Sequence, residues 1–217
     1  MADLSARALQ ALLSVRLGDA PLSDVLQRYT DIARDNLPGA DEVSVTLVRG
    51  DRPFTAAYSG QLALDADELQ YERGYGPCID AGLSGVLLRV DDMRAETRWP
   101  DYAAKVVPRG VLSSLSVPLP MQTDVVGALN CYAREAHAFS ERVHGVALEL
   151  AGHVGVAVAN AVTYSEATQL AAELQTAMLS RATIEQAKGI IMAQNRCDAD
   201  TAFDVLRRAS MGRNVKL

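Results

Sequence analysis

Hydrophobic positions in the first part of the chain change from helical spacing to strand alternation. Residues 1–37 read as two helices, the second with apolar residues every three or four positions until a Leu-Pro-Gly stop at 37–39. From Val43 to Leu47 apolar residues alternate with serine and threonine, and a polar turn leads to a second run at 54–58. The pattern predicts two helices followed by a β-hairpin.

The middle of the chain continues as strands between helical or irregular stretches. After a helical or irregular segment, the pattern predicts a short strand, a helix, and two long strands joined by a polar turn. These elements fall at residues 62–74, 86–90, about 99–107, 111–119 and 125–132, with the turn at 122–124. Antiparallel strands with helices gathered outside them indicate an α+β fold.

A helical pattern without proline runs from Ser140, a suitable N-cap, through at least Met178. Its apolar residues follow alternating four- and three-residue steps in two phases: Val143, Ala147, Leu150, Val154, Ala157 and Ala161, then Leu170, Leu174, Ala177 and Ile184. One small domain cannot cover so long a helix, so we expect its far part to form a coiled coil in a parallel homodimer. Small residues would let its near part lie against the sheet or a partner helix. A single unpaired helix is the alternative.

Charge is distributed unevenly along the chain. The 217 residues carry a net charge of −6, yet residues 181–217 hold seven lysines and arginines against four acids, a net of +3 that leaves −9 for the remainder. Contacts to phosphates require nearby positive charge, so a nucleic-acid interface is expected in this C-terminal segment. The alternative is that these charges form only a solvated helix face.

Cysteine usage and the chain's N-terminus bear on the compartment. The three cysteines, Cys78, Cys131 and Cys197, form no CxxC pair, and the three histidines have no ligands at metal spacing, so no metal site is expected. No run approaches 18 consecutive apolar residues, and the N-terminus lacks the order of a secretory signal. We expect a cytoplasmic protein with reduced thiols and no membrane contact.

Two segments near the C-terminus carry a family resemblance. Residues 182–192, ATIEQAKGIIM, and residues 202–210, AFDVLRRAS, resemble the start of an ANTAR domain. The resemblance implies binding of RNA stem-loops and control of transcription termination. Family members carry a further helix after the match to residues 214–217, so the resemblance implies an ANTAR domain that is incomplete at its C-terminus.

The resemblance also supplies candidate RNA contacts, carried over residue by residue. These are the basic and polar side chains of the segment: Arg181, Lys188, Arg207, Arg208, Arg213, Asn214 and Lys216. Asp198 is placed to cap the second helix. Apolar stripes run through Ile184, Ala187, Ile190 and Ile191, and through Ala202, Val205, Leu206 and Ala209 with Phe203. Because Phe203 falls in the second stripe, no aromatic side chain is expected to stack on a loop base.

A second resemblance covers the region before the long helix. The segments 74–82, 98–102, 110–119 and 127–130 resemble a GAF domain in order and spacing. The resemblance implies an antiparallel sheet with helices on one side and, on the other, loops that close a cavity for a small ligand. It does not identify that ligand, so the cofactor is unknown. GAF followed by ANTAR is typical of actinobacterial regulators.

Candidate cavity residues cluster around a glycine-rich turn. Gly74, Gly76 and Pro77 would set a tight turn that holds Cys78 and Ile79 at the cavity mouth. The proposed ligand contacts are Tyr71, Tyr75, Cys78, Ile79, Trp99 and Tyr102. The alternative is that the aromatic residues belong to the core and that the cysteine is buried and inert.

The sequence therefore divides into an N-terminal helix (1–20), a GAF domain (21–161), a coiled-coil linker helix (162–180) and a truncated ANTAR domain (181–217). The expected function is a signal-responsive, RNA-binding transcription antitermination regulator that is not an enzyme. One alternative is a dimeric GAF module that binds a ligand or a protein but no RNA. Another is a methionine sulfoxide reductase, which needs an attacking and a resolving thiol close together, with Cys78 and Cys131 as the pair.

Overall fold

A computed structural model describes residues 6–14, 21–50, 52–120 and 126–213 of the chain. The chain forms two compact units, Met1–Val162 and Thr163–Leu217. The helix α6 (Glu141–Asn195) contributes residues to both units.

The first unit is built on a five-stranded antiparallel sheet of order β2-β1-β5-β4-β3. The strands are β1 (Glu42–Arg49), β2 (Arg52–Tyr58), β3 (Leu88–Val90), β4 (Ser113–Pro118) and β5 (Val126–Ala133). The predicted hairpin and the two long strands are confirmed, whereas the strand predicted at 86–90 is only three residues long. The polar turn predicted at 122–124 lies outside the described residues. The predicted α+β fold is confirmed.

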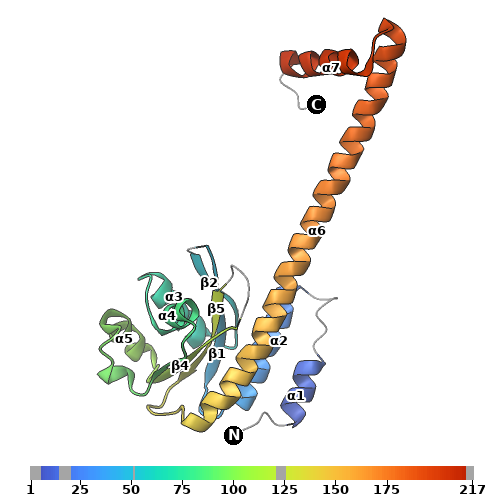
Figure 1. Cartoon of the computed structure of the whole chain (residues 1–217). Coiled ribbons are helices and arrows are strands. Elements are labelled where there is room, and N and C mark those ends of the chain that lie inside the picture. The colour runs from blue at the N-terminus through green and yellow to red at the C-terminus, as the bar shows by residue number, and fades with distance from the viewer. Residues whose placement is uncertain (1–5, 15–20, 51, 121–125, 214–217) are drawn as a thin grey trace. The chain divides into compact units, whose positions relative to one another are not determined.

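Helices cover both faces of the sheet rather than one (Figure 1). Besides α6 they are α1 (Ala6–Leu13), α2 (Leu22–Asn36), α3 (Gln61–Tyr71), α4 (Pro77–Ser84), α5 (Pro100–Val106) and α7 (Ala199–Arg213), with short 3-10 turns η1 (Met93–Ala95) and η2 (Val107–Arg109). The expected turn around Cys78 is instead the beginning of α4. Pro77 occupies its first position, where a missing N–H costs no helical hydrogen bond.

The face of the sheet toward α2 and α6 is the apolar core. Its buried residues include Val43, Val45, Leu115, Leu129 and Cys131 from the strands, and Val143, Ala147, Leu150, Val154 and Ala157 from α6. The first phase of the heptad-like spacing, from Val143 to Ala157, therefore packs on the sheet. By length and composition alone α6 could cross a membrane, but this apolarity is what packing against the sheet requires.

The second unit consists of the end of α6 and the helix α7. At the junction Arg196 has a φ of 52°, and the Asp198 side chain accepts a hydrogen bond from the Thr201 backbone N–H at 2.8 Å. The predicted cap is therefore confirmed. Ala202 of the second predicted stripe is fully buried, whereas Ile190, which was assigned to the first stripe, is 58% exposed.

Candidate ligand chamber and nucleic-acid interface

Polar side chains line the sheet face opposite the apolar core. Because alternate residues of a strand point to opposite faces, Val43, Val45 and Cys131 face the core while their neighbours face α3, α4 and α5. These neighbours are Ser44 and Thr46 on β1, Ser114 and Ser116 on β4, and Asn130 and Tyr132 on β5. All six are at most 1% exposed. We call this group of buried polar side chains, together with Asp67 of α3, the polar chamber.

Asp67 is the centre of the hydrogen bonds in the polar chamber. Its carboxylate accepts hydrogen bonds from the hydroxyls of Tyr132 and Thr55, the latter at 2.8 Å, and from Asn130 Nδ2 at 3.4 Å. Asn130 Nδ2 also donates to the Thr46 hydroxyl at 2.9 Å. Neighbouring strands and α3 are thus joined through one buried carboxyl group.

Burial controls the acidity of the groups in the polar chamber. Desolvation raises the pKa of Asp67 from 3.8 to about 6, although hydrogen bonds from Tyr132, Ser44 and Thr55 oppose the shift. Desolvation and the nearby Asp67 also raise the pKa of Tyr132. Each of these shifts disfavours a negative charge, so the tyrosine is neutral near pH 7 and the carboxyl group can be protonated under mildly acidic conditions.

Several buried polar atoms in the chamber make no hydrogen bond within the described residues. They are Ser114 Oγ, Ser116 Oγ and Asn130 Oδ1. The register places Ser114 opposite Tyr132 and Ser116 opposite Asn130. Unsatisfied buried polar atoms cost about 1–3 kcal/mol each, so a cluster of them calls for a partner such as water or a ligand.

The structure brings only some of the predicted cavity residues to the chamber. The Tyr71 hydroxyl bonds Thr46 and Thr55 at 2.8 and 2.9 Å, and the Cys78 thiol lies beside Thr46. Tyr102, fully buried on α5, interacts electrostatically with Asp67. These contacts place all three side chains near the carboxyl group.

Trp99 and Tyr75 pack in the apolar cluster that also contains Tyr102 and Tyr132, while their polar atoms engage other residues. Trp99 Nε1 donates to Asp80 at 2.8 Å, and Arg98 stacks 4.4 Å from the Trp99 ring centroid. Tyr75 is partly exposed and lies beside Asp101 of α5. Ile79 is buried in α4, so it does not stand at an open mouth.

The turn before α4 closes onto the chamber through Gln70. Gly76 has a φ of 154°, and a Cβ there would clash with the Gln70 side chain. Gln70 Oε1 accepts a hydrogen bond from the Cys78 backbone N–H at 2.8 Å, and its Nε2 donates to the Tyr132 hydroxyl at 3.2 Å. Glycine is needed because only it combines this backbone conformation with such a close approach.

Cys78 and Cys131 lie on opposite faces of the sheet. Cys131 belongs to the apolar core beside α2 and α6, whereas Cys78 lies beside Thr46 in the chamber. Burial raises the pKa of Cys131 to about 12 and that of Cys78 well above its ordinary value. The idea that these two thiols form an attacking and resolving pair is therefore wrong, because the sheet separates them and both favour the unreactive thiol form.

Sequence reasoning missed the residues at the centre of the chamber. Asp67, Asn130, Tyr132, Ser114 and Ser116 were not singled out. For the four strand residues the signal was the regular placing of polar residues at alternate positions, which reads equally well as a solvent-facing side of a sheet. Asp67, on the helix α3, had no such signal. No group of three or more His, Cys, Asp or Glu side chains gathers as a metal-binding set in the described part of the chain.

The second unit places the predicted RNA contacts in different surroundings. Arg207, Arg208 and Arg213 are exposed on α7, and Arg207 pairs with Asp204 at 3.1 Å. Lys188 is less available, because its side chain is 16% exposed and pairs with Glu185 at 3.0 Å. The candidates Asn214 and Lys216 lie outside the described residues.

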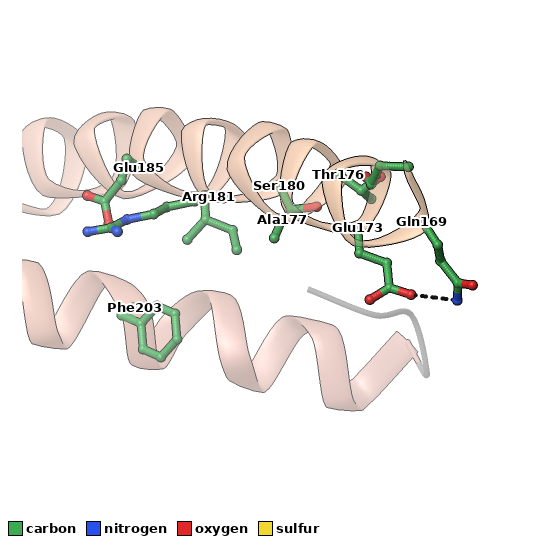
Figure 2. Close-up of a pocket in the computed structure, with 10 residues that line it drawn as sticks. Gln169, Glu173, Thr176, Ala177, Ser180, Arg181, Glu185 and Phe203 are labelled. Carbon is green, nitrogen blue, oxygen red and sulfur yellow. Dashed lines mark hydrogen bonds between the residues drawn. The ribbon is translucent and has the colours of Figure 1, made fainter. Parts of the chain in front are cut away.

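A pocket of about 750 Å³ lies between α6 and α7 (Figure 2). It is lined by Gln169, Ala172, Glu173, Thr176, Ala177, Ser180, Arg181, Ile184, Glu185 and Phe203. Arg181 thus faces this hollow. The assignment of Phe203 to the core stripe is wrong, because its side chain is 41% exposed here. The unit therefore does offer an aromatic surface beside a guanidinium group.

Solved structures share the fold of the first unit. The chain is similar to the free methionine-R-sulfoxide reductase from Neisseria meningitidis in complex with its substrate, at 19% identity and a TM-score of 0.54 over 74% of this chain and 95% of that one. It is also similar to the phycocyanobilin-bound GAF domain of a cyanobacterial phytochrome, at 18% identity and a TM-score of 0.53 over 71% and 93%. The GAF domain of an Acinetobacter phosphoenolpyruvate-protein phosphotransferase matches at 17% identity and 0.53 over 74% and 97%. Identities this low show the fold alone.

Family comparisons cover both units. Residues 19–159 match the GAF domain family, and residues 172–217 match the ANTAR domain family. Among curated proteins, none matches the chain. The GAF match spans well over half of the sequence, in agreement with the sheet and its buried polar chamber. The chain therefore belongs to the GAF domain family and carries an ANTAR domain at its C-terminal end.

Proposed function

We propose that this protein is a signal-responsive, RNA-binding transcription antitermination regulator. The observation that carries the proposal is the pairing of a GAF domain with an ANTAR domain in one chain. An ANTAR domain supplies the RNA-binding activity, and a GAF domain supplies a place for a signal. α6 holds residues of both units and is the physical connection between them.

The RNA contacts are assigned to exposed arginines of α7. Arg207, Arg208 and Arg213 carry positive charge within the segment 181–217, which bears a net +3. The ion pair between Arg207 and Asp204 does not oppose this role, because an exposed pair contributes only about 0–1 kcal/mol and exchanges readily for a phosphate. Phe203 adds an aromatic face on which an unpaired loop base can stack.

A parallel homodimer would deliver two RNA-binding units together. Between residues 163 and 183 every side chain that the structure describes is exposed, including the large apolar residues Leu170, Leu174 and Met178. Residues four apart share one helix face, so these three form an apolar stripe suited to a second copy of the helix. An isolated helix gains little stability in water, which favours such pairing.

Signal transfer in this scheme is a shift between two arrangements of the dimer. A ligand changes RNA affinity only by as much as it prefers one arrangement over the other. The polar chamber is the proposed ligand site, and the protein is proposed to act in the cytoplasm without contacting a membrane.

Gel-shift measurements on the full-length protein test this function. We expect RNA with two tandem stem-loops to bind more tightly than RNA of the same composition with scrambled stems. Binding should weaken with added salt, because phosphate contacts release counterions. Equal affinity for both RNAs would reject the proposal.

A second candidate function is a dimeric GAF module that binds a ligand or a protein without RNA. The exposed stripe of Leu170, Leu174 and Met178 favours association as such and says nothing about RNA. Dimers in solution together with no preference for stem-loops would support this candidate. An enzyme that uses the two thiols is not proposed, because Cys78 and Cys131 lie on opposite sheet faces.

A further inference from the structure

The polar chamber is acidic, and no basic side chain acts on its carboxyl group among the described residues. The groups that hydrogen-bond to Asp67 or act on it electrostatically include Tyr132, Asn130, Ser44, Thr55 and Glu68. Of these only Glu68 is charged, and it is also acidic. A fully buried carboxylate without a cation is costly, since hydrogen bonds from neutral donors replace only part of its hydration. The negative charge of the ionised Asp67 carboxylate therefore suits the polar chamber to binding a cation.

Vacant hydrogen-bonding atoms lie in the same chamber as this carboxyl group. Asn130 donates to Asp67 through Nδ2, while its Oδ1 has no partner. The Ser116 hydroxyl, opposite Asn130 in the sheet register, and the Ser114 hydroxyl, opposite Tyr132, also have none. An amide oxygen can only accept, and a hydroxyl can accept or donate. The unpartnered acceptor atoms of the chamber therefore favour a ligand with several N–H groups.

We propose that the polar chamber recognises a small ligand through a protonated amine held by Asp67, Asn130 Oδ1 and the serine hydroxyls of β4. The inference rests on the proposed role of the chamber as the signal site and names the chemical class of the signal. An ammonium group has three N–H donors and one positive charge, which match three acceptors and a carboxylate. A ligand recognised through phosphate or carboxylate would place like charge beside Asp67 with no cation to offset it.

The acidity of the chamber supports the same assignment. The Asp67 pKa of about 6 means that the free carboxyl group is mostly ionised at pH 7.5 and mostly protonated at pH 5. Tyr71, Tyr102, Tyr132 and Cys78, which also face the chamber, have pKa values raised by burial and stay neutral across this range. A cationic ligand favours the ionised carboxylate, so its binding should weaken as the pH falls through about 6.

Three probes of the same length separate the classes of ligand. Butylammonium, butyramide and butyrate present a cation, a neutral amide and an anion on equal chains, and the full-length protein can be titrated with each at pH 7.5. The readout is the NMR signal of the Asn130 side-chain amide. We expect butylammonium to bind at least about tenfold more tightly than butyrate, as a charge-assisted hydrogen bond implies. It should also bind about tenfold more weakly at pH 5 than at pH 7.5.

Variants provide the matched controls. Asp67→Asn should bring butylammonium down to the affinity of butyramide, whereas Asp65→Asn, on the same helix but partly exposed, should keep the preference. The inference is overturned if butyrate binds as well as butylammonium, if no probe perturbs the Asn130 signal, or if affinity is the same at both pH values. The pH comparison uses the unaltered protein, so it decides the question even where Asp67→Asn fails to fold. Binding of stem-loop RNA tests the proposed function separately, without any probe.

Discussion

Replacing Asp67 with asparagine should raise the free energy of unfolding, relative to that of the unaltered protein, as the pH increases from 4.5 to 8. The carboxyl group is fully buried and has a pKa near 6 instead of 3.8. Its raised pKa means that the folded state holds the proton more tightly than the unfolded state does. The resulting stabilisation is fully present below pH 3.8 and is lost as the pH rises through about 6. The amide introduced by Asp67→Asn carries no charge, so the variant would avoid this loss.

The expected magnitude follows from the size of the pKa shift. A rise from 3.8 to about 6 corresponds to about 3 kcal/mol over the whole titration. Between pH 4.5 and pH 8 the unaltered protein loses about 2 kcal/mol of this stabilisation, because the carboxyl group in the unfolded state is already partly ionised at pH 4.5. The free energy of unfolding of Asp67→Asn relative to the unaltered protein should therefore rise by about this amount.

Urea unfolding at several pH values measures this difference. The chain has one tryptophan, Trp99, which is 4% exposed in the first unit and reports unfolding by fluorescence. The comparison between pH values cancels any constant cost of losing the carboxylate as an acceptor for Tyr132. Asp65→Asn serves as the control, because water still reaches that side chain. A difference between Asp67→Asn and the unaltered protein that does not change with pH would refute the reasoning.

Two further predictions concern the closing turn and the thiols. Gly76→Ala should lower the free energy of unfolding more than Gly85→Ala does. Gly85 has a positive φ but open space around it, so its replacement should cost about 1 kcal/mol. Equal losses of stability in urea unfolding would show that the close approach at Gly76 is unimportant. Cys197 is partly exposed and should react with a thiol reagent in the folded protein, while Cys78 and Cys131 should react only after unfolding. Rapid modification of all three in the folded state would contradict their placement.

The fold was predictable from hydrophobic periodicity, but helix contacts were less so. Alternation at 43–47 and the spacing from Ser140 onward lead directly to β1 and α6. Periodicity does not state which partner an apolar face meets, so the packing of Leu150 on the sheet required the structure. The same limit explains Phe203, which shares the spacing of its stripe and yet remains 41% exposed.

The site was predicted less completely than the fold. Aromatic residues and the cysteine near the glycine turn were conspicuous in sequence, and three of them do lie by the chamber. Its polar centre depends on β1, β5 and α3 meeting, and only the tertiary fold brings Asp67 to Asn130 and Tyr132. A buried carboxyl group and a surface one look identical in a sequence, because burial is decided by elements far apart in the chain.

Read-through of a terminator in purified transcription tests the central claim most directly. The template carries two stem-loops upstream of a terminator, and the full-length protein is compared with the double variant Arg207→Ala/Arg208→Ala. As a matched control, Arg109→Ala removes an exposed arginine of the GAF domain. We expect increased full-length transcript with the unaltered protein and with Arg109→Ala, and a loss of that increase in the double variant. No increase with the unaltered protein, or an undiminished one with the double variant, would contradict the central claim.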